Sequence, residues 1–317
     1  MLEVEDKIIK MLKNGATFAK LQTKTGLTSS KLAHKLLILK NKGYVINKEF
    51  HEHGVKLWIN NQIIHTLQDN ISINCSNKFT FIALADTHIG NIYENMDAVK
   101  LLYKYALDKN IEYVVNLGDI TEGTSLKDGN DSRIKRFTLN EQIDFLTRNY
   151  LKYDTINTLY ILGNHDERWL NTGMDISKII DNRRYDMHCL GYKNSKITIG
   201  NKNILLHHPF SIERDHKYDK EIHKLYLNPE FDLVLRGHTH HNGIYINDMN
   251  SIVVHVPACY NSPTRKYTGA YQVTLRENDL ELTQLIIGDE VHDFSHIRIP
   301  FTRQNSESNK CLEKVIK

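Results

Sequence analysis

Five short polar motifs in this chain contain the residue types that bind divalent metal ions. They are Asp86-Thr87-His88, Gly118-Asp119, Gly163-Asn164-His165-Asp166, His207-His208 and Gly237-His238-Thr239-His240. Imidazole nitrogens suit manganese, iron, zinc or nickel, and carboxylate oxygens can bridge two such ions. Two cations about 3.5 to 4 Å apart neutralise a phosphoester and make hydroxide available at neutral pH. The motifs therefore indicate metal-assisted hydrolysis of a phosphoester.

Each motif follows a short apolar run that is typical of a strand buried on both faces. These runs are residues 79–85, 113–117, 158–162, 203–206 and 232–235, with a sixth run at 252–256 and helical patterns at 97–108 and 139–150. The alternation predicts an α/β fold. Because the carboxyl ends of strands in such a sheet meet at one crevice, the motifs can converge, although their anchors lie 33, 45, 43 and 31 residues apart. A glycine before Asp119, Asn164 and His238 would let the backbone turn sharply there.

In order and spacing, the five motifs resemble the calcineurin-like metallophosphoesterase superfamily, whose pattern is D-x-H, G-D, G-N-H-D/E, H and G-H-x-H. The resemblance covers residues 79 to about 260. It implies an α/β fold built as a four-layer α-β-β-α sandwich, in which two mixed sheets are flanked by helices. It also implies an enzyme, a metal-dependent phosphoester hydrolase.

The same resemblance implies a role for each site residue. The ligands would be Asp86, His88 and His240 for one metal, Asn164, His207 and His238 for the other, and Asp119 as the bridge. His208 remains an alternative to His207, which is favoured because the family usually uses the histidine directly at the strand end. His165 would protonate the leaving-group oxygen, and Asp166 would orient its ring. The expected cofactors are two divalent metal ions, with Mn²⁺ first and Fe, Zn, Ni or Mg as alternatives.

The first sixty residues predict a separate small domain. Apolar spacing, glycines and capping residues indicate helices at 4–12, 17–24 and 28–41, followed by strands at 44–47 and 55–59. This order resembles a winged helix-turn-helix domain with residues 28–41 as the recognition helix. Residues 1–70 contain eleven Lys against six Asp plus Glu, a net of +5, which leaves about −2 of the total +3 for the rest.

DNA is therefore the expected partner of residues 1–60. The candidate phosphate contacts are Lys31, Lys35, Lys40 and Lys42. The alternatives are a module that docks a protein and a lysine face that is merely solvated.

The predicted organisation is a winged helix-turn-helix domain at 1–60, a linker at 61–77, a phosphoesterase domain at 78–302 and a polar tail at 303–317. No apolar stretch is long enough to span a bilayer and the N-terminus is polar, so we expect no membrane association and a cytoplasmic location. The four scattered cysteines form no C-x-x-C pair and indicate neither a disulfide framework nor a zinc knuckle. A homodimer is possible, although no heptad pattern argues for one.

The expected substrate is a phosphodiester in DNA, which would make the chain a nuclease or phosphodiesterase. The segment from Asp86 to Gly90 is similar to that of DNA double-strand-break-repair nucleases, and a DNA-binding module would raise the local concentration of phosphodiester. Candidates to hold a polyanion are Arg133, Lys135, Arg136, Arg183, Arg184, Arg214 and Arg265. The alternative is a phosphatase or phosphodiesterase for nucleotides or other small molecules, with a regulatory or partner-docking N-terminal module. A DNA-binding regulator without hydrolysis is disfavoured by the complete ligand set.

Overall fold

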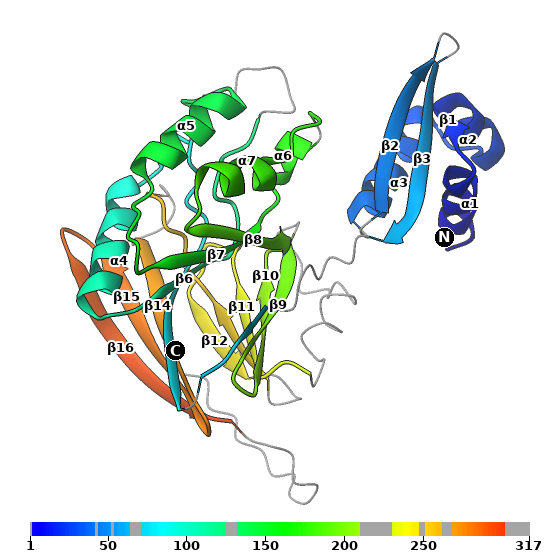
Figure 1. Ribbon diagram of the computed structural model, residues 1–317. Helices are drawn as coiled ribbons and strands as arrows, with labels where there is room; N and C mark the ends of the chain where they lie inside the picture. Colours follow the sequence, from blue (N-terminus) through cyan, green and yellow to red (C-terminus); the bar gives the residue numbers. More distant parts are fainter. Residues whose placement is uncertain are drawn as a thin grey trace, which may run out of the picture. The chain divides into compact units, whose positions relative to one another are not determined.

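The computed structural model describes residues 2–41, 44–51, 54–63, 71–75, 77–124, 132–170, 172–209, 230–246, 251–261 and 268–301. The chain divides into two compact units, Met1–Gln68 and Asp69–Lys317 (Figure 1). Each unit has its own apolar core.

The N-terminal unit contains three helices and a small antiparallel sheet. In chain order its elements are α1 (Leu2–Lys13), β1 (Ala16–Thr17), α2 (Phe18–Thr25), α3 (Ser29–Asn41), β2 (Tyr44–His51) and β3 (Gly54–Ile63), and the strands are ordered β1-β3-β2. The predicted helices and the two long strands are present, both strands extend beyond the predicted ranges, and β1 was not predicted. Leu12, Leu21, Leu32 and Ile59 are among the residues that form the core between the helices and β3.

Glycine ends α2 and sets the turn before α3. Gly26 has a left-handed conformation with φ 68°, and its amide donates to the carbonyl oxygen of Gln22. This conformation costs glycine little, because it lacks the Cβ atom that would clash in other residues. The turn places α3 three residues later, with its apolar side packed on the core of the unit.

The second unit contains two mixed sheets. The seven-stranded sheet has parallel strands β5 (Lys78–Leu84), β6 (Tyr113–Asn116), β7 (Asn157–Leu162) and β8 (Met187–Tyr192), extended antiparallel beside β5 by β14 (Thr268–Arg276), β15 (Asp279–Ile287) and β16 (Val291–Pro300). The six-stranded sheet has the order β12 (Gly243–Ile246), β13 (Ile252–His255), β11 (Leu233–Arg236), β10 (Lys202–His207), β9 (Asn194–Ile199) and β4 (Ile71–Ile73). All six predicted strands of this unit are present.

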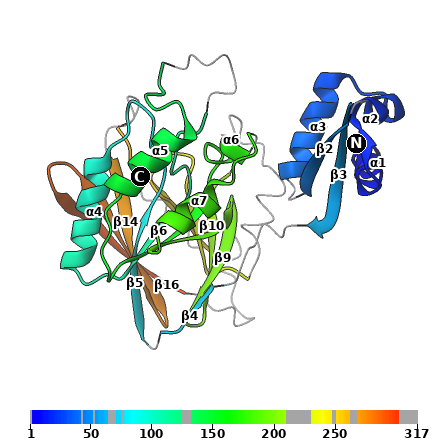
Figure 2. The same cartoon turned by 45° about the horizontal axis from the view of Figure 1, so that its top comes forward.

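The two sheets face each other across an apolar core that includes Phe81, Val115, Leu206 and Val254. Helices α4 (Met96–Asp108), α5 (Leu139–Asn149) and α7 (Ile176–Arg183) cover the opposite face of the seven-stranded sheet (Figure 2). The predicted α/β class with two mixed sheets is therefore confirmed.

The outer face of the six-stranded sheet is apolar at its centre, where Leu205, Phe231, Val234 and Val253 form a small cluster. Among the described residues no helix covers this face, so three of the four expected layers are seen.

Strand β4 lies within the range predicted as a linker and pairs in parallel with β9. That part of the range therefore belongs to the second unit. The predicted tail at 303–317 lies outside the described residues. No helix in the described parts is long and apolar enough to cross a membrane.

Candidate metal centre

The five motifs meet at the carboxyl ends of strands from both sheets. The first three follow β5, β6 and β7 of the seven-stranded sheet, and the last two follow β10 and β11 of the six-stranded sheet. The parallel direction of the strands within each sheet brings the motifs to one end of the sandwich. The expected convergence therefore occurs, although it joins two sheets and not one.

The side chains form two groups with the geometry of metal ligands. Asp86, His88 and His240 make one group and Asp119, His208 and His238 the other, and within each group the ligand atoms lie within 4.8 Å of one another. In the first group the Nε2 atom of His240 lies 3.3 Å from Oδ1 of Asp86 and 3.4 Å from Nε2 of His88.

One carboxylate oxygen lies between the two groups. Oδ2 of Asp119 is 3.8 Å from Nε2 of His88 and 3.2 Å from Nε2 of His208. Oδ1 of Asn164 also lies 3.1 Å from that His208 nitrogen. Asp119 thus has the position expected of a bridging ligand, and Asn164 stands with the second group.

The structure corrects the preference for His207 over His208. Side chains alternate along β10, so His207 shares the outer face of the sheet with Leu205, while Leu206 faces the core between the sheets. His207 pairs in register with Arg236, and burial together with the Arg236 charge holds the pKa of His207 well below its usual value. His208, one residue beyond the strand, reaches the metal centre.

The adjacent histidines allow a matched test of this assignment. We expect His208→Gln to weaken Mn²⁺ binding roughly 100-fold, because it removes a ligand, and His207→Gln to change it less than about threefold. Isothermal titration calorimetry on both variants measures the difference, with thermal unfolding as the control for folding. Equal losses in the two variants would contradict the assignment.

Contacts outside the ligand groups fix which nitrogen of each imidazole faces the centre. Nδ1 of His208 lies 2.6 Å from the carbonyl oxygen of Leu117, and Nδ1 of His88 lies 2.8 Å from the Glu122 carboxylate. Each Nδ1–H donates there, so Nε2 keeps its lone pair for a metal. Sequence reasoning missed Glu122, because a single glutamate three residues beyond Asp119 carries no recognisable pattern.

Two buried atoms at the centre fit a bound cation. Oδ1 of Asp86 and Nε2 of His238 have no hydrogen-bond partner among the described residues. Leaving such atoms unsatisfied in the interior costs free energy, and a metal ion would provide the missing partner. The donor set of imidazoles, carboxylates and one amide oxygen suits a transition metal.

The backbone is strained at five of the candidate ligands. Asp86, His88, Asp119, His238 and His240 have φ values of 55°, 45°, 50°, 71° and 55°, in the left-handed region that non-glycine residues rarely adopt. Strain of this kind persists where the surrounding structure enforces it, and it clusters at functional sites.

Close packing explains the glycine before Asn164. A Cβ atom on Gly163 would clash with Oδ1 of Asp119, so any larger residue would displace the carboxylate between the two groups. At Gly118 the φ of 97° already favours glycine, and a Cβ atom there would also lie 2.7 Å from Nδ1 of His208.

The second ligand group has an uneven charge pattern. Burial raises the pKa of Asp119, but the nearby imidazoles, led by His208, outweigh it and hold that pKa well below its usual value. Burial lowers the pKa of His208, but Asp119 outweighs it and raises the pKa to about 9. Burial lowers the pKa of His238 to about 4. At neutral pH and without a metal, Asp119 is therefore ionised, His238 is neutral, and His208 carries a second proton on Nε2, which a metal must displace.

This pattern predicts how metal binding depends on pH. Because a metal must displace the proton of His208, we expect Mn²⁺ affinity to fall roughly tenfold per pH unit as the pH decreases from 9 to 7, with about one proton released on binding. Calorimetry in buffers of different ionisation enthalpy measures both quantities. In His208→Gln the dependence of Mn²⁺ affinity on pH should become flatter. A wild-type affinity that does not change with pH would contradict the assignment of His208 as a ligand.

His165 belongs to neither of these two groups, although with His88 and Glu122 it forms a third cluster of possible ligand atoms. Its ring meets that of His88 edge to face at 4.6 Å, and its amide donates to Asp119 at 2.8 Å. Its Nδ1 atom lies 3.0 Å from the carbonyl oxygen of Glu122 and 3.3 Å from the carboxylate of that residue. The opposite edge of the ring, at Nε2, lies 3.0 Å from Nη2 of Arg168.

The predicted role of Asp166 in orienting His165 is wrong. The Asp166 carboxylate is fully buried and accepts hydrogen bonds from the amides of Gly163, Ile120 and Thr121 and from the Thr121 hydroxyl. It therefore joins two ligand-bearing loops, and Glu122 contacts the imidazole instead.

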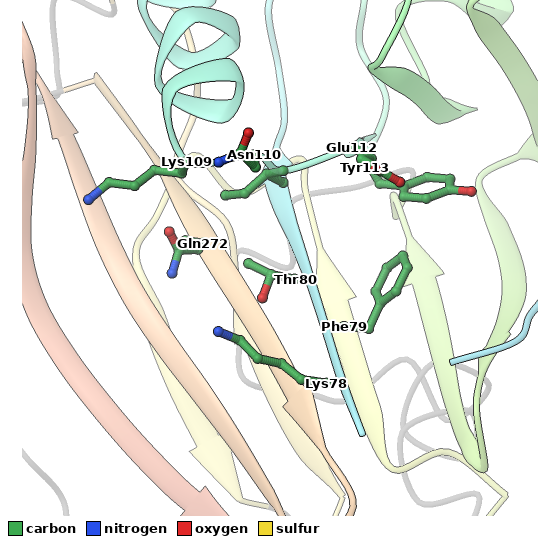
Figure 3. Close-up of a pocket in the computed structure, with 9 residues that line it drawn as sticks. Lys78, Phe79, Thr80, Lys109, Asn110, Glu112, Tyr113 and Gln272 are labelled. Carbon is green, nitrogen blue, oxygen red and sulfur yellow. The ribbon is translucent and has the colours of Figure 1, made fainter. Parts of the chain in front are cut away.

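A separate pocket of about 420 Å³ lies at the amino ends of β5 and β6, away from the motifs (Figure 3). Lys78, Lys109 and Gln272 lie on one side and the rings of Phe79 and Tyr113 on the other. It contains none of the candidate site residues.

The family model of the calcineurin-like phosphoesterases matches residues 79–242, which is more than half of the chain. No curated protein matches the chain.

Solved structures that are similar to the chain include phosphoesterases. A dimetal phosphatase from Danio rerio has 11% identity, with 72% of this chain and 100% of that chain covered and a TM-score of 0.45. The phosphoesterase Yfce from E. coli has 12% identity, with 71% and 100% covered and a TM-score of 0.40. On the match of the family model, the chain belongs to the calcineurin-like phosphoesterase family and is a metal-dependent phosphoester hydrolase.

Proposed function

We propose that the chain is a dinuclear metal-dependent phosphodiesterase that acts on DNA. The observation that carries the dinuclear part is the position of the Asp119 carboxylate between two groups of ligands. Mn²⁺ is the metal we expect first, because imidazole and carboxylate ligands both suit it. When bound, the two metals would neutralise the phosphoryl oxygens and supply the nucleophile.

The residues of the chain would do the rest of the chemistry. Asp86, His88 and His240 would hold one metal, and Asn164, His208 and His238 the other, with Asp119 shared. His165 would donate a proton to the leaving-group oxygen from Nε2, while Glu122 holds its Nδ1 edge.

The N-terminal unit supports DNA as the substrate. Its order α1-β1-α2-α3-β2-β3, with a short glycine turn before α3, is the arrangement expected of a winged helix-turn-helix domain. Lys31 and His34 are exposed on α3, whose opposite side is buried in the core. A helix of this kind can enter the major groove of DNA.

Two of the four candidate lysines can be located. Lys31 is exposed, whereas Lys35 forms an ion pair with Glu5 of α1 at 2.6 Å and is 16% exposed. Lys35 therefore joins α3 to α1, and this ion pair makes it a poor candidate for a phosphate contact. The side chain of Lys40 and the whole of Lys42 lie outside the described residues.

A panel of substrates tests this proposal. The full-length protein with Mn²⁺ should cleave a small phosphodiester and labelled DNA, and turnover of a phosphomonoester alone would overturn the DNA reading. Lys31→Ala should weaken DNA binding, because it removes one phosphate contact. For the same reason, the slope of the logarithm of the DNA-binding constant against the logarithm of the salt concentration should become shallower by about 1. Lys100→Ala on α4, which removes the same charge from the second unit, serves as the matched control.

A second candidate function is hydrolysis of nucleotides or other small phosphoesters. Three of the arginines expected to hold a polyanion are engaged elsewhere: Arg136 contacts Glu94, Arg183 contacts Asp144, and the buried Arg184 contacts Asp186. Lys135 also contacts Glu94. Arg214 and Arg265 lie outside the described residues. Among the described residues these contacts leave fewer cations for a polyanion, which favours a small substrate, and the same panel distinguishes the two functions.

A further inference from the structure

Arg168 directs its guanidinium group toward the metal centre from α6 (Glu167–Leu170). Its Nη2 atom lies 3.0 Å from Nε2 of His165, and its Nη1 atom donates to the carbonyl oxygen of Glu122 at 3.2 Å. The next residue, Trp169, is buried in the core between the helices and the seven-stranded sheet. Arg168 and Trp169 thus point in different directions from the same helical turn. Because the Trp169 indole is anchored in the core, it fixes the backbone from which Arg168 reaches the centre.

The contact with His165 places the guanidinium where a substrate must lie. Nε2 is the ring edge left for the leaving-group oxygen, because Nδ1 faces Glu122. An oxygen hydrogen-bonded to Nε2 would lie about 3 Å from it. Since Nη2 of Arg168 is itself 3.0 Å from the same nitrogen, it stands beside the reacting phosphoryl group.

A guanidinium group has only donors, so Nη2 must donate and Nε2 must accept in the ligand-free arrangement. An anionic phosphoryl oxygen is a stronger acceptor than a neutral imidazole nitrogen. We propose that Arg168 binds a phosphoryl oxygen of the substrate and rests on His165 while the site is free of substrate. When this hydrogen bond moves from the imidazole to the phosphate, Nε2 is free to take up a proton from solvent, and it can then give that proton to the leaving-group oxygen.

Other features of Arg168 suit this role. Its side chain is 27% exposed, so a ligand can reach it. The Glu122 carboxylate lies 3.9 Å from Nη1, farther than in the close pairs of Arg136, Arg183 and Arg184, which are at 2.6 Å. The planar group can donate to two oxygens at once, which suits phosphate recognition. The inference rests on phosphoester hydrolysis and not on DNA as the substrate.

Kinetics on the full-length protein test this role. We expect Arg168→Gln to lower kcat/KM roughly 10- to 100-fold for any phosphoester that the wild type cleaves, and to weaken inhibition by inorganic phosphate to a similar extent. Mn²⁺ affinity should remain within about twofold. Arg148→Gln, which changes an exposed arginine of α5, is the matched control and should leave all three quantities unchanged.

Chemical rescue distinguishes a role of Arg168 in binding phosphate from a purely structural role of its side chain. Millimolar guanidinium chloride should restore activity to Arg168→Ala in a saturable manner and should leave the wild type unchanged. Loss of activity with unchanged phosphate inhibition, or with an equal loss of Mn²⁺ affinity, would overturn the inference. If the wild type cleaves no phosphoester, the proposed function fails, and calorimetry of inorganic phosphate binding to the Mn²⁺-loaded proteins still decides the role of Arg168.

Discussion

Asp119→Asn should reduce hydrolysis roughly 10³-fold, which corresponds to about 4 kcal/mol of transition-state stabilisation. The carboxylate lies between the two ligand groups, at 3.8 Å from His88 and 3.2 Å from His208. An amide has nearly the same shape but one acceptor oxygen and no negative charge, so it cannot bridge two cations in the same way. The loss should appear in kcat with every phosphoester substrate.

The measurement compares initial rates of Asp119→Asn and the wild type at saturating Mn²⁺, with metal content determined on the same samples. Asp97→Asn is the matched control, because Asp97 is an exposed carboxylate at the start of α4. Activity that persists unchanged in Asp119→Asn would exclude a centre built around this carboxylate.

His165→Asn should have an effect that depends on the leaving group. If His165 protonates the leaving oxygen, its removal should cost roughly 10² to 10³-fold with an alkyl phosphodiester, whose leaving group is poor. With a nitrophenyl ester, whose leaving group departs without a proton, the loss should be less than about tenfold. Metal affinity should be little changed, because His165 belongs to neither ligand group.

A series of diesters with leaving groups of graded pKa provides this test. The slope of log kcat against leaving-group pKa should become steeper in His165→Asn than in the wild type. His188→Asn, at an exposed histidine of β8, should leave the slope unchanged. An equal loss across the series would contradict the role in proton donation and would indicate a general disturbance of the site.

Much of the fold and centre could be predicted because the relevant patterns are local. Buried strands read as apolar runs, and the motifs follow them directly, so Asp86, Asp119 and His238 could be placed at strand ends. The pairing of the strands into two sheets depends on contacts distant in sequence, which no local pattern records. The sequence therefore predicted convergence, but only the structure shows that both sheets contribute.

The choice between His207 and His208 shows a finer limit. Successive side chains point to opposite faces of a strand, so an error of one residue in the strand register exchanges the two histidines. The two residues before the pair in β10 are fully buried leucines, Leu205 on the outer face and Leu206 on the inner face. Hydrophobicity alone could not tell which face belonged to the core between the sheets.

Side-chain partners were the least predictable part of the site. Asp166 follows His165 in sequence, which suggested contact, yet its carboxylate binds backbone amides of another loop. Glu122 and Arg168 follow different motifs and meet only in the folded chain. Such contacts depend on three-dimensional packing, and adjacency in sequence is a poor guide to them.

Metal reconstitution tests the central claim most directly. The full-length protein, stripped of metal by a chelator, should be inactive on a small phosphodiester and should regain activity in proportion to added Mn²⁺, with a break at two ions per chain. In His208→Gln the titration should shift to higher Mn²⁺ concentration. Full activity of the stripped protein, or a break at one ion per chain, would contradict a centre of two metals joined by Asp119.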